Sequence, residues 1–225
     1  MTKKLSILTI LAAIAVCGGA FAAEDGDYSR YISARVGYAG MNGVDGNPGS
    51  SSLSIAYGIK GAESLADFIG AGDHISDQMQ NISLRAEAEF SNQGFETNSG
   101  YYSSANNWFN KKINRSVNTF TINGYADFMK DEKIRPYVSA SVGFGVISSD
   151  NSQDGKYNRS FGRGSLYLPT ESPLTVSLAY GLGVGETMDI SDRLRGDLGA
   201  RVLILHIAGY SVKLFNITLG IRYDF

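Results

Sequence analysis

The stretch Ser83-Leu84-Arg85-Ala86-Glu87-Ala88-Glu89-Phe90 alternates strictly between two kinds of side chain. Leucine, alanine and phenylalanine occupy the even positions, and serine, arginine and glutamate occupy the odd ones. Because successive residues of a β-strand point to opposite faces of a sheet, this period of two predicts a strand with one apolar and one charged face. A soluble sheet would turn the apolar face towards a core. A membrane barrel turns it towards lipid and turns the charged face into its lumen.

Seven other segments alternate in the same way, and each has roughly the nine to eleven residues that cross a bilayer as a tilted strand. They are residues 31–40, 53–60, 119–128, 136–146, 174–185, 194–203 and 215–225. Eight such segments in series predict an all-β fold, an eight-stranded antiparallel up-and-down transmembrane β-barrel. Eight is also the strand number at which side chains just fill a barrel interior.

The first residues predict export. Lys3 and Lys4 precede the apolar segment 5–16, and Ala20-Phe21-Ala22 has the A-x-A pattern of a cleavage site. Residues 1–22 are therefore expected to be a secretory signal peptide. Their apolar core of about twelve residues is too short for a membrane-spanning helix.

Three alternatives to this cleavage remain open. Ala23 is the second choice of cleavage position, and a buried N-terminal helix is disfavoured by the flanking pattern. Lipid attachment at Cys17 is disfavoured because Val16 is not a small residue. With cleavage after Ala22, residues 23–225 form the barrel domain.

Composition limits what the exported chain does. Removal of residues 1–22 leaves 203 residues and lowers the formal net charge from −2 to −4, which argues against a nucleic-acid partner. The only cysteine, Cys17, leaves with the signal peptide, so no disulfide is expected. No later stretch approaches eighteen apolar residues, so the bilayer would be crossed by a closed barrel.

The predicted lumen is rich in charge. Six cationic and four anionic residues fall on inward positions: Arg35, Lys60, Arg85, Arg195, Arg201 and Arg222 with Glu87, Glu89, Asp127 and Asp197. In so narrow a space these groups must pair or be hydrated. One interpretation is a hydrogen-bonded ionic plug that rigidifies the barrel. The other is a gated pore with some preference for anions.

The predicted connections differ in length. Segments 129–133 and 186–193 are short, as expected of periplasmic turns. Segments 41–52, 91–118 and 147–173 are long and 204–214 is moderate, as expected of loops on the outer side. Segment 61–81 is too long for a turn, and Ala62–Gly70 within it could form a short helix. It is either a periplasmic insertion or a sign that the second strand is misplaced.

The long segments 91–118 and 147–173 are the predicted functional loops, because loops on a rigid scaffold carry most recognition. Segment 91–118 combines aromatic and basic residues: Tyr101, Tyr102, Trp108, Phe109, Lys111, Lys112 and Arg115. Such a mixture resembles a recognition surface for a host or surface ligand. Alternatively, the aromatic residues fold back on the barrel rim and the basic residues neutralise lipopolysaccharide phosphates.

Three stretches carry a family resemblance. Residues 83–90 look like an R-x-E-x-E-aromatic strand. Asn123–Phe128 followed by 134–138 and 143–145 is similar to an N-x-Y-x-D-F … PYVGxGxG core, and Ile217–Phe225 ends in an aromatic residue. The chain resembles the opacity/surface-antigen and OmpA-type family of eight-stranded outer-membrane barrels, also described as porin-family proteins, over most of residues 28–225.

The resemblance implies integral insertion in the bacterial outer membrane and contact with lipid and lipopolysaccharide. It also implies that Leu219, Ile221, Tyr223 and Phe225 form the signal read by the barrel-assembly machinery. Segment 61–81 departs from the family pattern, as do Ser139 and Ser141, where glycines are commoner. No peptidoglycan-binding domain follows Phe225, so no role in anchoring to the cell wall is expected.

Catalysis is not expected. The chain has two histidines, His74 beside Asp73 and Asp77, and His206 with Ser211 five residues later. A catalytic triad needs three converging groups, and the sequence shows no such convergence. No metal-binding or phosphate-binding motif is present, so no cofactor or metal is expected. The prediction is a non-enzymatic structural or surface-interaction barrel. A narrow porin for small solutes is the alternative, and a lipid-A-modifying enzyme is a remote one.

Overall fold

The computed structural model describes residues 28–42, 49–64, 81–104, 107–129, 132–159, 162–170, 174–207 and 210–225. These residues form nine strands: β1 (Tyr28–Asn42), β2 (Gly49–Ser64), β3 (Ile82–Ser104), β4 (Asn107–Phe128), β5 (Ile134–Arg159), β6 (Gly162–Thr170), β7 (Leu174–Asp189), β8 (Leu194–Ile207) and β9 (Tyr210–Asp224). No helix among the described residues has the length and apolar character needed to cross a membrane.

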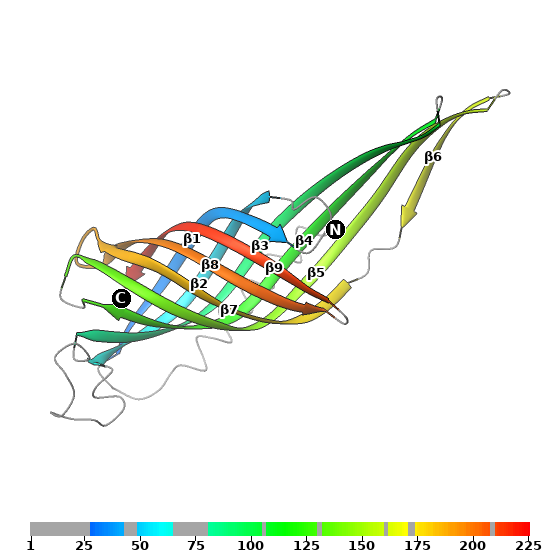
Figure 1. The fold of residues 1–225 in the computed structure, drawn as a ribbon. Coiled ribbons are helices and arrows are strands. Elements are labelled where there is room, and N and C mark those ends of the chain that lie inside the picture. Colours follow the sequence, from blue (N-terminus) through cyan, green and yellow to red (C-terminus); the bar gives the residue numbers. More distant parts are fainter. Residues whose placement is uncertain are drawn as a thin grey trace.

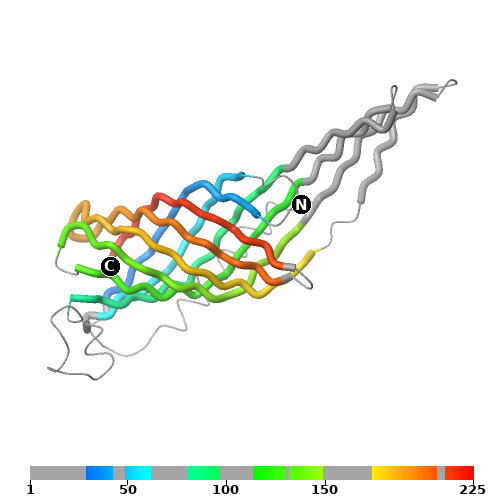
Figure 2. Tube along the Cα trace, viewed as in Figure 1, coloured from blue at the N-terminus to red at the C-terminus, as the bar shows by residue number. Residues whose placement is uncertain are grey.

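Eight of the nine strands close into an antiparallel barrel. Each barrel strand pairs with its neighbours in chain order, β7 follows β5 directly, and β9 pairs with β1 to complete the ring. Figures 1 and 2 show this ring of tilted strands. Closure leaves the barrel without a free edge, which is the requirement for a sheet in hydrocarbon. The predicted eight-stranded barrel is therefore confirmed, and β6 is a ninth strand outside it.

The barrel is apolar on its outer surface and polar on its inner surface, which is the reverse of a soluble protein. Leu182 and Val36 on the outer surface are 71% and 57% exposed, whereas Arg35 and Glu87 on the inner surface are 5% and 1% exposed. Burying charge while exposing a continuous apolar belt is favourable only where the outer surface meets lipid. The alternation read from the sequence therefore sets which residues line the lumen.

Backbone hydrogen bonds gather several strand ends at one end of the barrel. The amide of Asp189 donates to the carbonyl of Lys133, that of Asp224 to Arg193, and that of Phe225 to Arg30, each at 2.9 Å. Residues 190–193 form the short β7–β8 turn there. We call this end, which holds the C-terminus in Figure 1, the C-terminal end.

Two predicted loops are strands instead. Segments 91–118 and 147–173 were expected to be connections, but β3 and β4 continue as a paired hairpin to Ser104 and Asn107, and β5 continues to Arg159. The prediction failed because apolar alternation marks a strand only inside the membrane. Beyond the bilayer neither face must be apolar, so serine, asparagine and charged residues can continue the ladder.

The extra strand length builds a sheet beyond the barrel rim, at the end opposite the C-terminal end (Figure 1). Its strands are β3 from residue 94, β4 up to residue 116, β5 from residue 149, and β6, which pairs with β5 alone. We call this four-stranded extension the projecting sheet. At about 3.3 Å per residue, β3 from residue 94 to Ser104 spans roughly 35 Å along the strand.

The first residues of the unusual segment 61–81 belong to a strand. β2 continues to Ser64, with a register shift against β3 between Lys60 and Ser64. The expected helix over Ala62–Gly70 is therefore wrong for residues 62–64, which pairing with β3 keeps extended. Residues 65–80 lie outside the described part of the chain.

Candidate functional site

The middle of the lumen holds a network of ion pairs centred on Arg35 of β1 and on Arg85 and Glu87 of β3. Arg35 Nη2 donates to both carboxylate oxygens of Glu87, at 2.8 and 2.9 Å, and Arg85 Nη1 donates to the same carboxylate at 3.1 Å. All three residues are buried. An ionised group loses several kcal/mol of hydration on burial, so each is stabilised here only by its partners.

Arg35 also joins two carboxylates from other strands. Its Nη1 donates to Glu89 and its Nε donates to Asp197 of β8, each at 3.2 Å. Glu89 in turn accepts from Arg201 of β8 at 2.6 Å and from the amide of Asn123 of β4 at 3.3 Å. The Arg35 guanidinium thereby connects β1 with β3, which lies beyond β2, and with β8, which lies beyond β9.

Arg85 completes the network on the other side. Its Nε donates to Asp127 of β4 at 2.9 Å, and its guanidinium carbon lies 3.7 Å from the ring centre of Tyr125 and 4.8 Å from that of Tyr137. A cation over an aromatic face is stabilised by the ring quadrupole, more so when desolvated. We call the seven charged residues of this cluster the central network: Arg35, Arg85, Arg201, Glu87, Glu89, Asp127 and Asp197.

Tyrosine hydroxyls donate further hydrogen bonds to two carboxylates of the central network. Tyr31 and Tyr125 donate to Glu87, at 3.0 and 2.7 Å, and Tyr137 donates to Asp197 at 3.3 Å. Glu87 therefore accepts from two arginines and two tyrosines. Buried charges that are this fully bonded lock the strands in one register.

Gly58 makes room for one of these tyrosines. A Cβ at residue 58 would lie 2.2 Å from Cζ of Tyr31, whereas one at Gly124, on the outer surface, would meet nothing within 4 Å. We expect Gly58→Val to lower the free energy of unfolding by about 1–3 kcal/mol, because Tyr31 must leave Glu87. Gly124→Val is the matched control and should be nearly neutral. Urea titration followed by gel mobility measures both, and equal effects would contradict this role of Gly58.

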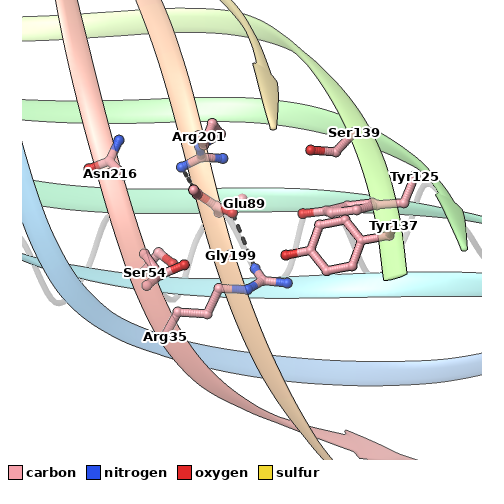
Figure 3. A pocket seen from close by; sticks show the side chains of 11 residues that line it. Arg35, Ser54, Glu89, Tyr125, Tyr137, Ser139, Gly199, Arg201 and Asn216 are labelled. Atoms are coloured by element: carbon pink, nitrogen blue, oxygen red, sulfur yellow. Dashed lines mark hydrogen bonds and ion pairs between the residues drawn. The ribbon is translucent and has the colours of Figure 1, made fainter. Parts of the chain in front are cut away.

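A small cavity adjoins the central network (Figure 3). It has a water-accessible volume of about 30 Å³, and its lining includes Arg35, Glu89, Arg201, Tyr137 and Asn216. This volume suits about two water molecules, which polar walls of this kind would hold. Both polar side-chain atoms of Asn216 are buried without a protein partner, so they are available to such waters.

Towards the projecting sheet the lumen becomes apolar. Ten buried residues, each at most 7% exposed, form one cluster there: Ala39, Met41, Phe95, Val117, Ile147, Ala179, Leu203, Leu205, Val212 and Leu214. We call this cluster the apolar cap. It was not predicted, because nearly all of its members lie at or beyond the predicted strand ends. Ala179 is the exception, since it lies within the predicted segment 174–185. Ion passage would require this layer to open as well as the central network.

A second set of ion pairs lies towards the C-terminal end. Asp189 of β7 pairs with both Arg135 of β5 and Arg195 of β8, the latter at 2.9 Å. Asp224 of β9 pairs with Arg195 at 2.5 Å and with Arg222 at 3.5 Å. These five residues form an alternating series of arginine and aspartate that we call the terminal chain.

The structure places every predicted luminal residue on the inner side of the barrel or half-buried beside it. It separates them into two groups, with Arg195 and Arg222 in the terminal chain and the other predicted residues, except Lys60, in the central network. Sequence reasoning missed Arg135, Asp189 and Asp224 and the role of the three tyrosines. These three charged residues fall on inward positions when the alternation of their strands is continued to the strand ends. That signal in the sequence would have found them.

The predicted recognition residues lie in the projecting sheet. In the β3–β4 ladder Tyr101 is opposite Phe109 and Tyr102 is opposite Trp108, and Lys111 and Lys112 follow on β4. Arg115 is half-buried at the base of the sheet, and its Nη1 has no hydrogen-bond partner.

Three of the four predicted assembly residues lie on β9, the strand that closes the barrel against β1, and Phe225 directly follows that strand. Leu219, Ile221 and Tyr223 are exposed on the outer surface, and the ring of Phe225 lies 6.4 Å from that of Tyr57 on β2. Their place fits a lipid-facing closing strand.

His206 and Ser211 are brought together at the rim. They are opposite each other in the β8–β9 ladder, and Ser211 Oγ lies 2.6 Å from His206 Nδ1. The ring of Tyr180 packs edge-on against His206. Among the described residues no carboxylate hydrogen-bonds to His206, so the orienting member of a triad is not found there. His74 lies outside the described residues.

Comparison with known proteins bears on the fold. No protein-family model and no curated protein matches the sequence. Neisserial surface protein A matches in structure with a TM-score of 0.55 and 14% identity, over 89% of this chain and 100% of that one. Ail of Yersinia pestis matches with a TM-score of 0.42 and 19% identity, over 87% of this chain and 99% of that one. The chain has the fold of the eight-stranded outer-membrane β-barrels, as its sequence resemblance implied.

Proposed function

We propose that this chain is an integral outer-membrane barrel with a closed lumen, which anchors the projecting sheet as a surface-recognition element. Residues 1–22 are its export signal and residues 23–225 its barrel domain. The C-terminal end faces the periplasm, and the projecting sheet stands outside the cell among lipopolysaccharide. Leu219, Ile221, Tyr223 and Phe225 are read by the barrel-assembly machinery. The protein performs no catalysis and needs no cofactor.

The observation that carries this proposal is the contrast between the two ends of the molecule. At the C-terminal end, β7 and β8 are joined by the turn 190–193. At the other end β3, β4 and β5 continue far beyond the residues that pair around the barrel. Strands of this length are not needed to cross a bilayer, and a sheet that continues beyond the barrel offers backbone edges to a partner.

The closed lumen supports an anchoring role over transport. A porin of this fold would need a continuous water path through the apolar cap and past Arg35 and Glu87. The cap residues Leu203, Leu205 and Leu214 are completely buried, with no accessible surface left for water. The small cavity beside the central network has room for about two water molecules, and it leaves the ion pairs of that network in place.

The proposal is tested by removing the projecting sheet from the intact barrel. We expect a variant in which residues 97–113 and residues 149–173 are each replaced by a two-residue hairpin turn to fold with unchanged heat-modifiable gel mobility. Bacteria displaying the natural chain should adhere to cultured epithelial cells, and bacteria displaying the shortened chain should not. Equal adherence of the two strains would refute recognition by the projecting sheet.

A control variant tests whether recognition depends on the positive charge of two lysines. Substituting Lys111 and Lys112 with alanine keeps the strands and removes two cations. If adherence depends on shape and aromatic residues, it survives this change at physiological ionic strength. If the two lysines are the contact, adherence is lost at once and weakens with salt in the natural chain.

A further inference from the structure

The terminal chain contains more cations than anions. It has three arginines and two aspartates, and both of its ends are arginines, Arg135 and Arg222. Lys60 adds a further cation from β2, where it lies opposite Arg85. The terminal chain and Lys60 together have two more cations than anions, and the central network has one more carboxylate than arginine. The two sets and Lys60 therefore carry a net excess of one cation. A buried excess of charge is costly unless a counter-ion neutralises it.

Among the charged residues that the structure describes, Arg222 has the most side-chain atoms that are buried without a hydrogen-bond partner. It is 2% exposed, and its Nε and Nη1 are buried without a hydrogen-bond partner in the protein. Its nearest carboxylate oxygen, on Asp224, is 3.5 Å from Nε, and its guanidinium carbon lies 4.9 Å from the ring centre of Tyr31. An arginine usually places such donors on a carboxylate or phosphate, two at a time.

Two buried hydroxyls without partners lie opposite arginines of the terminal chain. Ser33 is opposite Arg222 in the β1–β9 ladder, and Thr187 is opposite Arg135 in the β5–β7 ladder. Both hydroxyls are buried and have no hydrogen-bond partner in the protein. A hydroxyl donates to an anion as readily as to water, so these groups add neutral donors to the cationic ones.

This end of the lumen is also accessible from outside. The side chains of Asp189, Arg195 and Asp224 are 34%, 15% and 12% exposed, whereas that of Arg85 in the central network is 0% exposed. A small solute can therefore reach the terminal chain from the C-terminal end without crossing the central network.

From these observations we infer that the C-terminal mouth of the lumen binds a small oxyanion, a phosphate or carboxylate group, on Arg222 beside Arg195 and Lys60. The anion accepts from Arg222 Nε and Nη1 and offsets the excess of cations. The site is separate from the projecting sheet, so it stands whether or not that sheet recognises a partner.

Isothermal titration of inorganic phosphate into the folded chain in neutral detergent tests this site. We expect saturable binding of one phosphate per barrel, and a rise of the urea midpoint with phosphate that sodium chloride of equal ionic strength does not reproduce. Arg222→Gln should weaken binding about 10- to 100-fold, which corresponds to one lost charge-assisted contact. Arg222→Lys, which keeps the charge, should retain part of the affinity.

Arg30→Gln is the matched control, because Arg30 is an exposed arginine at the same end of the barrel. It should leave phosphate binding unchanged. Absence of saturable binding, or equal weakening by Arg30→Gln and Arg222→Gln, would overturn the inference, because the donors would then be satisfied by water alone.

Repeating the titration in bilayer discs identifies the source of the anion. If phosphatidylglycerol suppresses phosphate binding and phosphatidylcholine does not, the natural ligand is an anionic headgroup. If neither lipid interferes, it is a soluble anion of the periplasm.

Discussion

Arg35→Ala is expected to lower the free energy of unfolding by about 3–5 kcal/mol, the usual cost of breaking a buried ion pair by removing one partner. Arg35 bonds to Glu87, Glu89 and Asp197, all of them buried. Without it, four buried carboxylates of the central network face two arginines. The loss comes mostly from carboxylates that remain buried without compensation, not from the bonds themselves.

The measurement is a urea titration of the folded barrel in lipid vesicles, read as the fraction with folded gel mobility. Arg30→Ala, at an exposed site on the same strand, serves as the control and should change stability by about 0.5 kcal/mol or less. A loss below about 1 kcal/mol for Arg35→Ala would show that water enters and solvates the three carboxylates.

Leu205→Ala is expected to cost about 2–5 kcal/mol, the range for a buried leucine that leaves a cavity. Leu205 has no exposed surface, and one of its methyl carbons lies 2.2 Å from where a Cβ of Gly145 would be. The space left by the truncated side chain cannot be refilled by residue 145, because glycine has no side chain. The apolar cap should therefore lose contacts without repacking.

Leu174→Ala makes the same chemical change where no cavity can form, since Leu174 is 68% exposed at the start of β7. It should cost less than about 1 kcal/mol in the same urea titration. Similar losses for the two variants would mean that the apolar cap is not a packed layer.

The alternation of residues 83–90 and its seven repeats carried enough information to predict the barrel, because membrane thickness imposes a fixed strand length and a fixed choice of face. The same rule explains what was missed. Phe95, Val117 and Leu205 keep the inward parity but lie beyond the predicted strands, in a part of the chain where the outer face is no longer apolar. Parity alone also could not show that inward residues would change from ionic to apolar along the lumen.

The central network could be predicted as a set of inward charges but not as a set of pairs. Arg35 and Asp197 are 162 positions apart in the chain and meet only because β9 closes the ring between them. Likewise, the sequence placed Tyr125 on the inner face, but its bond to Glu87 depends on the stagger of β3 against β4. Partner choice follows from the register of a closed barrel, which a single sequence does not reveal.

Single-channel recording of the folded chain in a planar bilayer tests the closed lumen most directly. No discrete current steps are expected for the natural chain, with insertion confirmed by heat-modifiable gel mobility, because both the central network and the apolar cap block the path. Reproducible conductance steps in the natural chain that change in Arg35→Ala would contradict a closed lumen and would make the lumen a pore.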